Sequence, residues 1–151
     1  SFIRHDDELV LNHWAVHLDN RYQQRLYPGP SSDSPSMVLE SQKPGEMLRL
    51  KSPAITGLEP GMKFCLRIVC RKKENFSGAF GVYVTIARRM ANGSERSDII
   101  FVKEPTLAKQ GWLAGQKTFE IPSGAEQLQV EFRGEFAGSL ELQSLVLERK
   151  E

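Results

Sequence analysis

The sequence predicts an all-β fold, a sandwich or a barrel of roughly nine antiparallel strands. Apolar side chains alternate along many short runs, and turns rich in Gly, Pro and Asn separate these runs at regular intervals. No long amphipathic helix is visible. With 151 residues, 40% of them hydrophobic, the chain has the size and composition of one domain. We expect residues 1–151 to form a single domain, and the absence of an initial Met predicts an excised domain of a larger protein or a processed chain.

The stretch from Pro53 to Arg71 has the clearest pattern. Its Gly-Leu-Glu-Pro-Gly segment predicts a turn, because the ring of Pro60 fixes φ and Gly61 can adopt a positive φ. From Met62 onward the residues alternate, which predicts a strand with one buried face. The inward residues are Phe64, Leu66, Ile68 and Cys70, and the outward residues are Cys65, Arg67, Val69 and Arg71.

The N-terminal third has weaker patterns. Residues 13–19 predict a strand with Trp14 inward, although two histidines spaced four positions apart leave a helix as an alternative. Residues 28–36 contain three prolines and four serines, which predicts a polar loop. Two further strands are expected at residues 37–40 and 46–52.

The C-terminal half continues the alternation. Asn92-Gly93 predicts a hairpin, and residues 134–138 predict a turn between the last two strands. Phe119 and Ile121 are in phase on the inward side of one strand, and Trp112 at its start is expected in the core. The strands in this half are expected at residues 79–88, 98–102, 112–121, 128–133 and 139–147.

Composition excludes several function classes. The net charge is +1, so bulk electrostatics predict no binding to nucleic acid. No apolar run approaches the roughly 20 residues of a membrane helix, so we expect no membrane insertion. The odd spacing of Cys65 and Cys70 places them on opposite faces of one strand, which predicts one core cysteine, one outward thiol and no disulfide.

The sequence contains no recognisable catalytic signature. A Gly-rich phosphate loop, a nucleophile elbow and a CxxC pair are all missing. The best metal candidates are His13, His17 and Asp19. Along a strand the two histidines would lie roughly 13 Å apart, too far to share an ion, whereas on a helix they could share one. We therefore expect solvated histidines and no cofactor.

The outward faces of three strands are more informative about function. They carry Arg67 and Arg71, then Tyr83 and Thr85, then Gln129, Glu131 and Arg133. If these strands are neighbours, their side chains form a polar face whose donors, acceptors and aromatic ring suit a sugar. Tyr27, beside the Pro/Ser-rich loop, is a candidate for stacking at the edge of this face. The alternative is an ordinary solvated face with cross-strand Arg–Glu pairs.

A series of short motifs follows the chain in order. They are Trp14, Ser36-Met37-Val38-Leu39, I-T-G-L-E-P-G-M-K-F at 55–64, Trp112 with F-E-I-P-S-G-A at 119–125, L-Q-V-E-F at 128–132, and G-S-L-E-L-Q-S-L-V-L at 138–147. In order and spacing, and over most of the chain, they resemble the jelly-roll carbohydrate-binding modules appended to glycan-active proteins. The resemblance implies a two-sheet antiparallel β-sandwich without catalysis, and sugar binding on the concave sheet or at loops along one edge.

The chain departs from this family's pattern at two points. Such modules often carry an acidic residue in the last strand that helps to bind a structural calcium, but Gln143-Ser144 stands there, which does not support a calcium site. A binding face with several tryptophans is also not evident. This departure favours a soluble or charged glycan as ligand, or the loss of sugar binding.

These observations predict a non-catalytic carbohydrate-binding module that recognises a glycan or polysaccharide. The predicted site residues are Tyr27, Arg67, Arg71, Tyr83, Gln129, Glu131 and Arg133. The alternative is a protein–protein or domain-packing module, in which the same face contacts a neighbouring domain of the parent protein. A small enzyme is the least favoured interpretation, because the sequence suggests no nucleophile–base pair.

Overall fold

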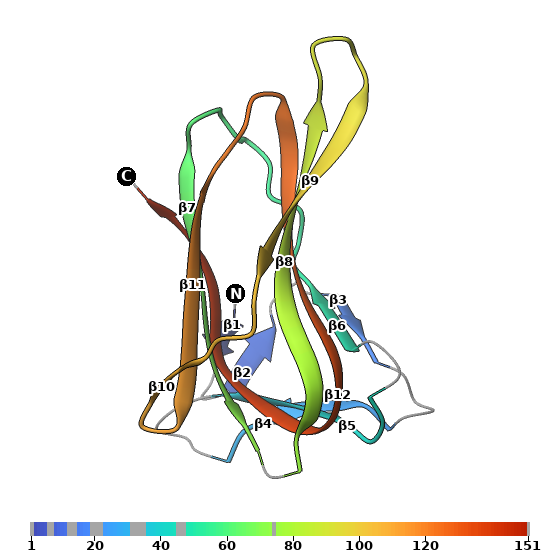
Figure 1. Ribbon diagram of the computed structural model, residues 1–151, viewed down its shortest axis with the longest axis vertical. Helices are drawn as coiled ribbons and strands as arrows, with labels where there is room; N and C mark the ends of the chain where they lie inside the picture. Colours follow the sequence, from blue (N-terminus) through green and yellow to red (C-terminus); the bar gives the residue numbers. More distant parts are fainter. Residues whose placement is uncertain are drawn as a thin grey trace.

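The computed structural model describes the whole chain except residues 1, 6–7, 12–14, 19–22, 31–35, 45–47, 74 and 151. The described residues form strands and connections without a helix, which confirms the all-β prediction (Figure 1). The strands are β1 (Phe2–His5), β2 (Glu8–Leu11), β3 (Ala15–His17), β4 (Arg25–Pro28), β5 (Met37–Ser41), β6 (Leu48–Lys51), β7 (Lys63–Lys72), β8 (Ser77–Arg89), β9 (Glu95–Val102), β10 (Leu107–Lys109), β11 (Trp112–Glu120) and β12 (Ala125–Lys150).

The strands form a sandwich of two antiparallel sheets that share β12. The β8 sheet has the order β9–β8–β12–β6–β3, and the β7 sheet has the order β10–β11–β7–β12–β5–β4. Strands β1 and β2 pair with each other. Figure 1 shows β12 following β8 down one side of the molecule and then following β7 up the other side. The predicted two-sheet sandwich is therefore confirmed.

Strand β12 replaces the two last strands that the sequence predicted. It runs without interruption from Ala125 to Lys150, so the predicted turn at 134–138 is wrong. Ala137 is the last residue paired with β8, and Gly138 is the first paired with β5. Gly138 has a φ of 93°, and a Cβ there would lie 2.5 Å from the carbonyl oxygen of Asn75. A glycine therefore bends the chain from one sheet into the other while the strand continues.

Other differences concern short strands. The described part of the chain has twelve strands rather than roughly nine, because β1, β2, β4 and β10 were not predicted and the last two predicted strands form the single strand β12. Strands of three or four residues contain too little alternation to be recognised. Residues 15–17 form a strand, which excludes the helical alternative there. Trp14 lies outside the described residues.

The two turns predicted from glycine are confirmed. Gly61 has a φ of 89° and leads directly into β7. Gly93 has a φ of 84° in the hairpin between β8 and β9, where the Ser94 amide donates to Asn92 Oδ1 at 2.9 Å. Both positions use the left-handed region that glycine adopts without steric cost.

The core lies between the two sheets. The inward residues of β7 are buried as predicted, with Leu66 and Ile68 each 1% exposed. Each such side chain contributes about 1.5–3 kcal/mol through burial. Cys65 corrects one prediction, because it is as buried as Cys70 despite its outward strand position. Both cysteines are free thiols. No helix in the described part of the chain is long and apolar enough to span a bilayer.

Candidate functional site

The structure divides the predicted site residues between two faces. Arg67, Arg71 and Tyr27 belong to the β7 sheet, whereas Tyr83 and the predicted residues of β12 belong to the β8 sheet. The expectation that all of them share one face is therefore wrong. The reason is β12, whose first half pairs with β8 and whose second half pairs with β7.

One row of side chains crosses the outer face of the β7 sheet. Tyr27 is in register with Val38, Val38 with Glu141, and Glu141 with Arg71. The guanidinium of Arg71 lies 4.4 Å from the centroid of the Trp112 ring. The row therefore extends over five strands, from an aromatic ring on β4 to a second one on β11.

Trp112 corrects a sequence-based expectation. It was expected in the core, but it is half-buried and contacts Arg71 on the outer face. Phe119 and Ile121 of the same segment are 9% and 2% exposed, as predicted. Trp112 differs from them in parity, so strict alternation along β11 already places it on the opposite face. That signal was present in the sequence.

Glu141 is the buried centre of the row and was not predicted. Its residue exposure is 2%. Its Oε2 accepts from Arg71 Nη2 at 2.8 Å and from Lys73 Nζ at 2.9 Å, while Ser36 Oγ donates to Oε1 at 2.9 Å. Burial acts to raise the pKa of Glu141, but hydrogen bonds from these three donors outweigh it and lower the pKa. The carboxylate is therefore a fixed negative charge that orients Arg71.

A shallow depression lies beside this row, between β7 and β11. Its volume is about 260 Å³. Val69 and Ala114 are in register in the middle, and Arg67 and Gln116 are in register one step along the strands. Since alternate residues share a face, these four side chains and Trp112 line one side of the sheet. The depression thus combines an apolar floor with polar side chains.

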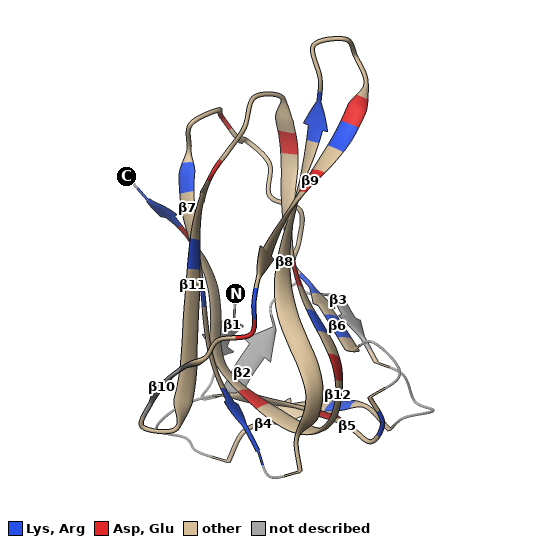
Figure 2. Ribbon diagram, in the orientation of Figure 1, with Lys and Arg blue, Asp and Glu red and all other residues tan. Residues whose placement is uncertain are grey.

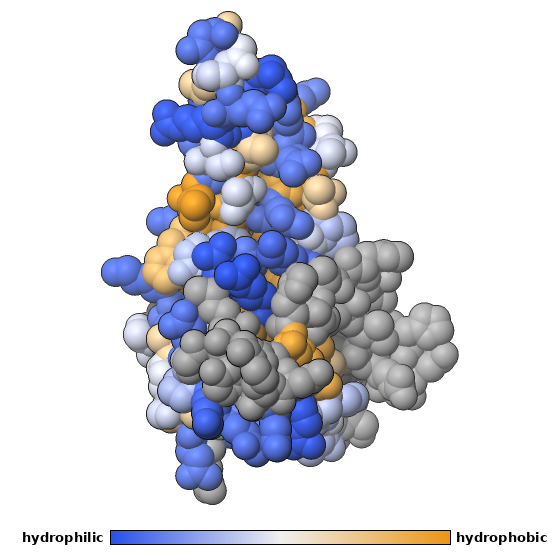
Figure 3. Space-filling view, turned by 90° about the vertical axis from the view of Figure 1, so that its right-hand side faces the viewer, coloured by the Kyte–Doolittle hydropathy of each residue, from blue (hydrophilic) through white to orange (hydrophobic). Residues whose placement is uncertain are grey.

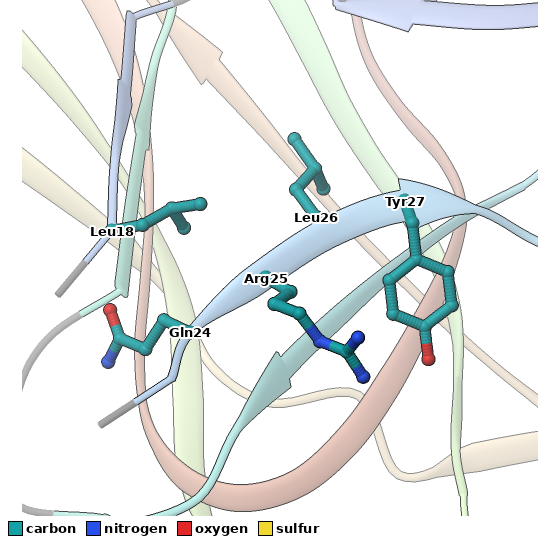
Figure 4. Close-up of a pocket in the computed structure, with 5 residues that line it drawn as sticks. All are labelled: Leu18, Gln24, Arg25, Leu26 and Tyr27. Carbon is teal, nitrogen blue, oxygen red and sulfur yellow. The ribbon is translucent and has the colours of Figure 1, made fainter. Parts of the chain in front are cut away.

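Tyr27 stands at the far edge of the face, on β4. Its residue is 36% exposed, and the guanidinium of Arg25 lies 5.4 Å from its ring centroid. Arg25 also pairs with Glu40 through Nε at 2.8 Å. Figure 4 shows Arg25 and Tyr27 projecting from one side of β4, while Leu26 projects from the opposite side. An open depression of about 600 Å³ follows this edge.

The outer face of the β8 sheet holds the other predicted residues. Glu131 is in register with Tyr83, and the guanidinium of Arg133 lies 4.4 Å from the centroid of the Tyr83 ring. Arg133 Nη2 donates to Glu131 Oε2 at 3.0 Å. Gln129 instead donates through Nε2 to the backbone oxygen of Ser52 at 2.9 Å, so its side chain supports the sheet.

Charges of both signs are interspersed on the two sheets (Figure 2). On the β7 sheet Arg67 Nη1 lies 2.7 Å from Glu148 Oε2, with both side chains nearly half exposed. The arginines named above on both faces thus have carboxylate partners. Such a surface has no single-sign field that would attract a polyanion.

Metal and nucleophile chemistry have little support in the described residues. Among them, no group of three His, Cys, Asp or Glu side chains could hold a metal ion. His13 and Asp19 lie outside the described residues, as does the side chain of His17. Burial raises the pKa of the Cys70 thiol to about 12, which leaves that cysteine unreactive.

Comparison with known proteins identifies the fold. No model of a known protein family matches the sequence, and no curated protein is significantly similar to it. Among solved structures, a family 16 carbohydrate-binding module matches with a TM-score of 0.56 at 14% identity, over 83% of this chain and 85% of that chain. The CBM22-2 xylan-binding domain of Paenibacillus barcinonensis Xyn10C matches with a TM-score of 0.58 at 9% identity, over 93% and 94%.

The chain has the β-sandwich fold of carbohydrate-binding modules. Its sheets also match part of the enzymatically active domain of bacteriophage CBA120 tailspike protein 4, with a TM-score of 0.64 at 16% identity. That match covers 92% of this chain but only 20% of the tailspike chain. At these identities the similarity establishes the fold, and the site has to be argued from its own geometry.

Proposed function

We propose that this domain is a non-catalytic carbohydrate-binding module whose site is the outer face of the β7 sheet. The observation that carries the proposal is the row in which Arg71 is held between the Trp112 ring and the buried carboxylate of Glu141. The fold shared with carbohydrate-binding modules supports the same role. Of the predicted residues, Tyr27, Arg67 and Arg71 belong to this site, and Trp112 and Gln116 join them.

Each part of this face suits one feature of a sugar. The apolar floor of Val69 and Ala114 faces the C–H surface of a sugar ring, and Trp112 offers aromatic surface beside it. Arg67 and Gln116 offer donors to vicinal hydroxyls at the other end of the depression. Arg71 is fixed by stacking and ion pairing, so little side-chain entropy is lost when it donates to a ligand.

The charge balance of the face favours a neutral glycan over an acidic one. Arg67 and Arg71 each have a carboxylate partner within 2.8 Å, so an acidic sugar would have to displace a glutamate. Hydroxyl groups can instead accept from the donor positions that remain on each guanidinium. Binding should therefore change little between low and moderate salt.

The absence of catalysis in this proposal rests on the chemistry of the described residues. Glu141 is the buried carboxylate of the face, and its lowered pKa keeps it ionised, which suits an anchor and not a general acid at neutral pH. The buried Cys70 thiol is unreactive. The proposed role is thus to hold a glycan in place.

The test is binding to a panel of soluble polysaccharides by affinity electrophoresis and calorimetry. The panel contains xylan, mixed-linkage β-glucan, galactomannan and, as an acidic member, polygalacturonate. We expect wild type to bind a neutral member and Trp112→Ala to lose at least tenfold in affinity, with Trp112→Phe partly restoring it. Arg96→Ala, on the exposed part of β9, is the matched surface control. Unchanged binding by Trp112→Ala would reject this face, and no binding by wild type would reject the function.

A further inference from the structure

We propose that the outer face of the β8 sheet carries a second saccharide site, sized for one sugar ring. The class of ligand rests on the proposed function, but the geometry is independent of the first site. The site is a depression of about 180 Å³ bordered by Phe101, Tyr83, Arg133 and Glu135, with Gly81 and Ala79 at its base. Register places Phe101 beside Tyr83 and Gly81 beside Arg133.

Gly81 makes room for the Phe101 ring that borders this depression. A Cβ at Gly81 would lie 2.5 Å from Cε2 of the Phe101 ring, so the ring occupies the space where a side chain would stand. Phe101 is nevertheless 44% exposed, and its ring centroid is 4.9 Å from that of Tyr83. An aromatic wall thus stands over a base without bulky side chains. Figure 3 views this side of the molecule, where hydrophobic atoms interrupt the hydrophilic surface.

The polar part of the site is held in place but incompletely hydrogen-bonded. Arg133 stacks on Tyr83 and donates to Glu131, whose residue exposure is 6%. Arg133 Nε and Glu131 Oε1 are both buried without a hydrogen-bond partner, and Arg49 Nε forms an ion pair with that oxygen at 3.7 Å. Buried polar atoms are rarely left unpaired, and a bridging water or a ligand hydroxyl can supply the missing partner.

Charge and volume define the ligand. Of the charged residues that line the depression, Arg133 is balanced by Glu135, and the adjacent Glu131 pairs with both Arg133 and Arg49, so the site has no net attraction for an anion. A volume of 180 Å³ corresponds to about six water molecules at roughly 30 Å³ each, which suits one sugar ring. The ligand class is therefore a neutral monosaccharide unit, such as the end or a side branch of a glycan.

The consequence is a module with binding sites on its two opposite outer faces. The β7 face would hold one glycan segment and the β8 face a single ring of another. Two sites on one rigid sandwich can bridge two chains, or raise the avidity for a branched one.

The test is nuclear magnetic resonance titration of the ¹⁵N-labelled domain with methyl glycosides of xylose, glucose, mannose and galactose. We expect at least one glycoside to shift amide signals of residues 79–83, 101 and 133–135. Phe101→Ala should abolish these shifts while leaving those of residues 67–71 and 112–116 intact, and Trp112→Ala should do the reverse. Arg133→Lys keeps the charge but removes the planar fork of the guanidinium. It should weaken the affinity measured from the shifts of residues 79–83, 101 and 133–135 at least fivefold.

The outcomes separate the two proposals. Shifts confined to the β7 face reject the second site alone, and shifts confined to the β8 face reject the β7 face as the proposed binding site while leaving the second site standing. Normal binding by Phe101→Ala and Arg133→Lys also rejects the second site. Light scattering tests the protein-docking alternative: a wild-type dimer that Phe101→Ala converts to a monomer would assign this patch to a protein interface and overturn the inference.

Discussion

The two outer faces of the sandwich repeat one arrangement of three side chains. On each face an arginine guanidinium lies 4.4 Å from the centroid of an aromatic ring and pairs with a buried glutamate. The sets are Arg71, Trp112 and Glu141 on the β7 sheet, and Arg133, Tyr83 and Glu131 on the β8 sheet. Both glutamates come from β12, one from each half.

The two faces differ in how completely the glutamate is hydrogen-bonded. Glu141 accepts from Arg71, Lys73 and Ser36, so both of its oxygens are used. Glu131 accepts from Arg133, but its Oε1 has no hydrogen-bond partner. The carboxylate is therefore fully hydrogen-bonded on one face and only partly on the other, whereas the arginine Nε is buried without a hydrogen-bond partner on both faces. A fully bonded carboxylate suits an anchor, and a partly bonded one can still accept from a ligand.

The largest expected effect is on stability when each glutamate is replaced by glutamine. Glu141→Gln should lower the free energy of unfolding by about 3 kcal/mol, since it leaves Arg71 and Lys73 facing a neutral group in a buried place. Glu131→Gln should cost about 1–2 kcal/mol, because one of its oxygens has no hydrogen bond and only the ion pair with Arg49 at 3.7 Å. Urea unfolding measures both. Equal losses would show that the two faces do not differ in the way proposed.

The matched control for these variants is Glu148→Gln. Glu148 and its partner Arg67 are both nearly half exposed, so their ion pair should contribute less than about 1 kcal/mol. A larger loss would mean that exposed pairs, and not only the buried glutamates, determine the stability of the β7 face.

The next effect concerns the bend that places one strand on both faces. Gly138→Ala should destabilise the fold by about 2 kcal/mol or more, because φ is 93° and the new Cβ would meet the Asn75 carbonyl oxygen at 2.5 Å. Gly93→Ala is the control, since its φ is 84° but no atom lies within 4 Å, so strain alone should cost about 1 kcal/mol. Urea unfolding compares the two, and equal losses would remove the role assigned to the Asn75 contact.

A smaller effect is expected for the stacked arginines. A double-mutant cycle with Arg71→Met and Trp112→Leu should give a coupling energy of about 1 kcal/mol in urea unfolding. The cycle with Arg133→Met and Tyr83→Leu should give a similar value, since the distance is the same. A coupling near zero on one face would show that the ring there is a neighbour of the arginine without stabilising it.

The smallest effect near neutral pH comes from the titration of Glu141. Its pKa is lowered from the ordinary value of 4.5, so its stabilising contribution is complete above that value and is lost as the pH falls through the folded-state pKa. We expect stability to be flat from pH 7 to 5 and to fall below pH 4.5. Urea unfolding of wild type and Glu141→Gln over this range measures it. Parallel profiles of the two proteins would assign the fall to other carboxylates.

The sequence by itself determined the turns at Gly61 and Gly93. It also determined, through the alternation of apolar and polar residues, which side chains of most strands point inward and which point outward. These features are local, because steric limits on φ and the pleat act within a few residues. The outward position of Trp112 could also have been predicted from strict alternation, because Trp112 lies an odd number of residues from the inward Phe119. Glu141 stands between Leu140 and Leu142, so alternation places it outward as well.

Only the tertiary structure decided which outward residues meet. Local alternation states on which side a residue lies, but not which sheet its strand joins. The continuation of β12 through Gly138 separates Arg71 from Arg133, although both are outward arginines. The donors that surround Glu141 come from residues 36, 71 and 73, which lie 105, 70 and 68 positions away along the chain, so their approach depends on long-range strand pairing. Such contacts are non-local, so the pattern within one strand contains no information about them.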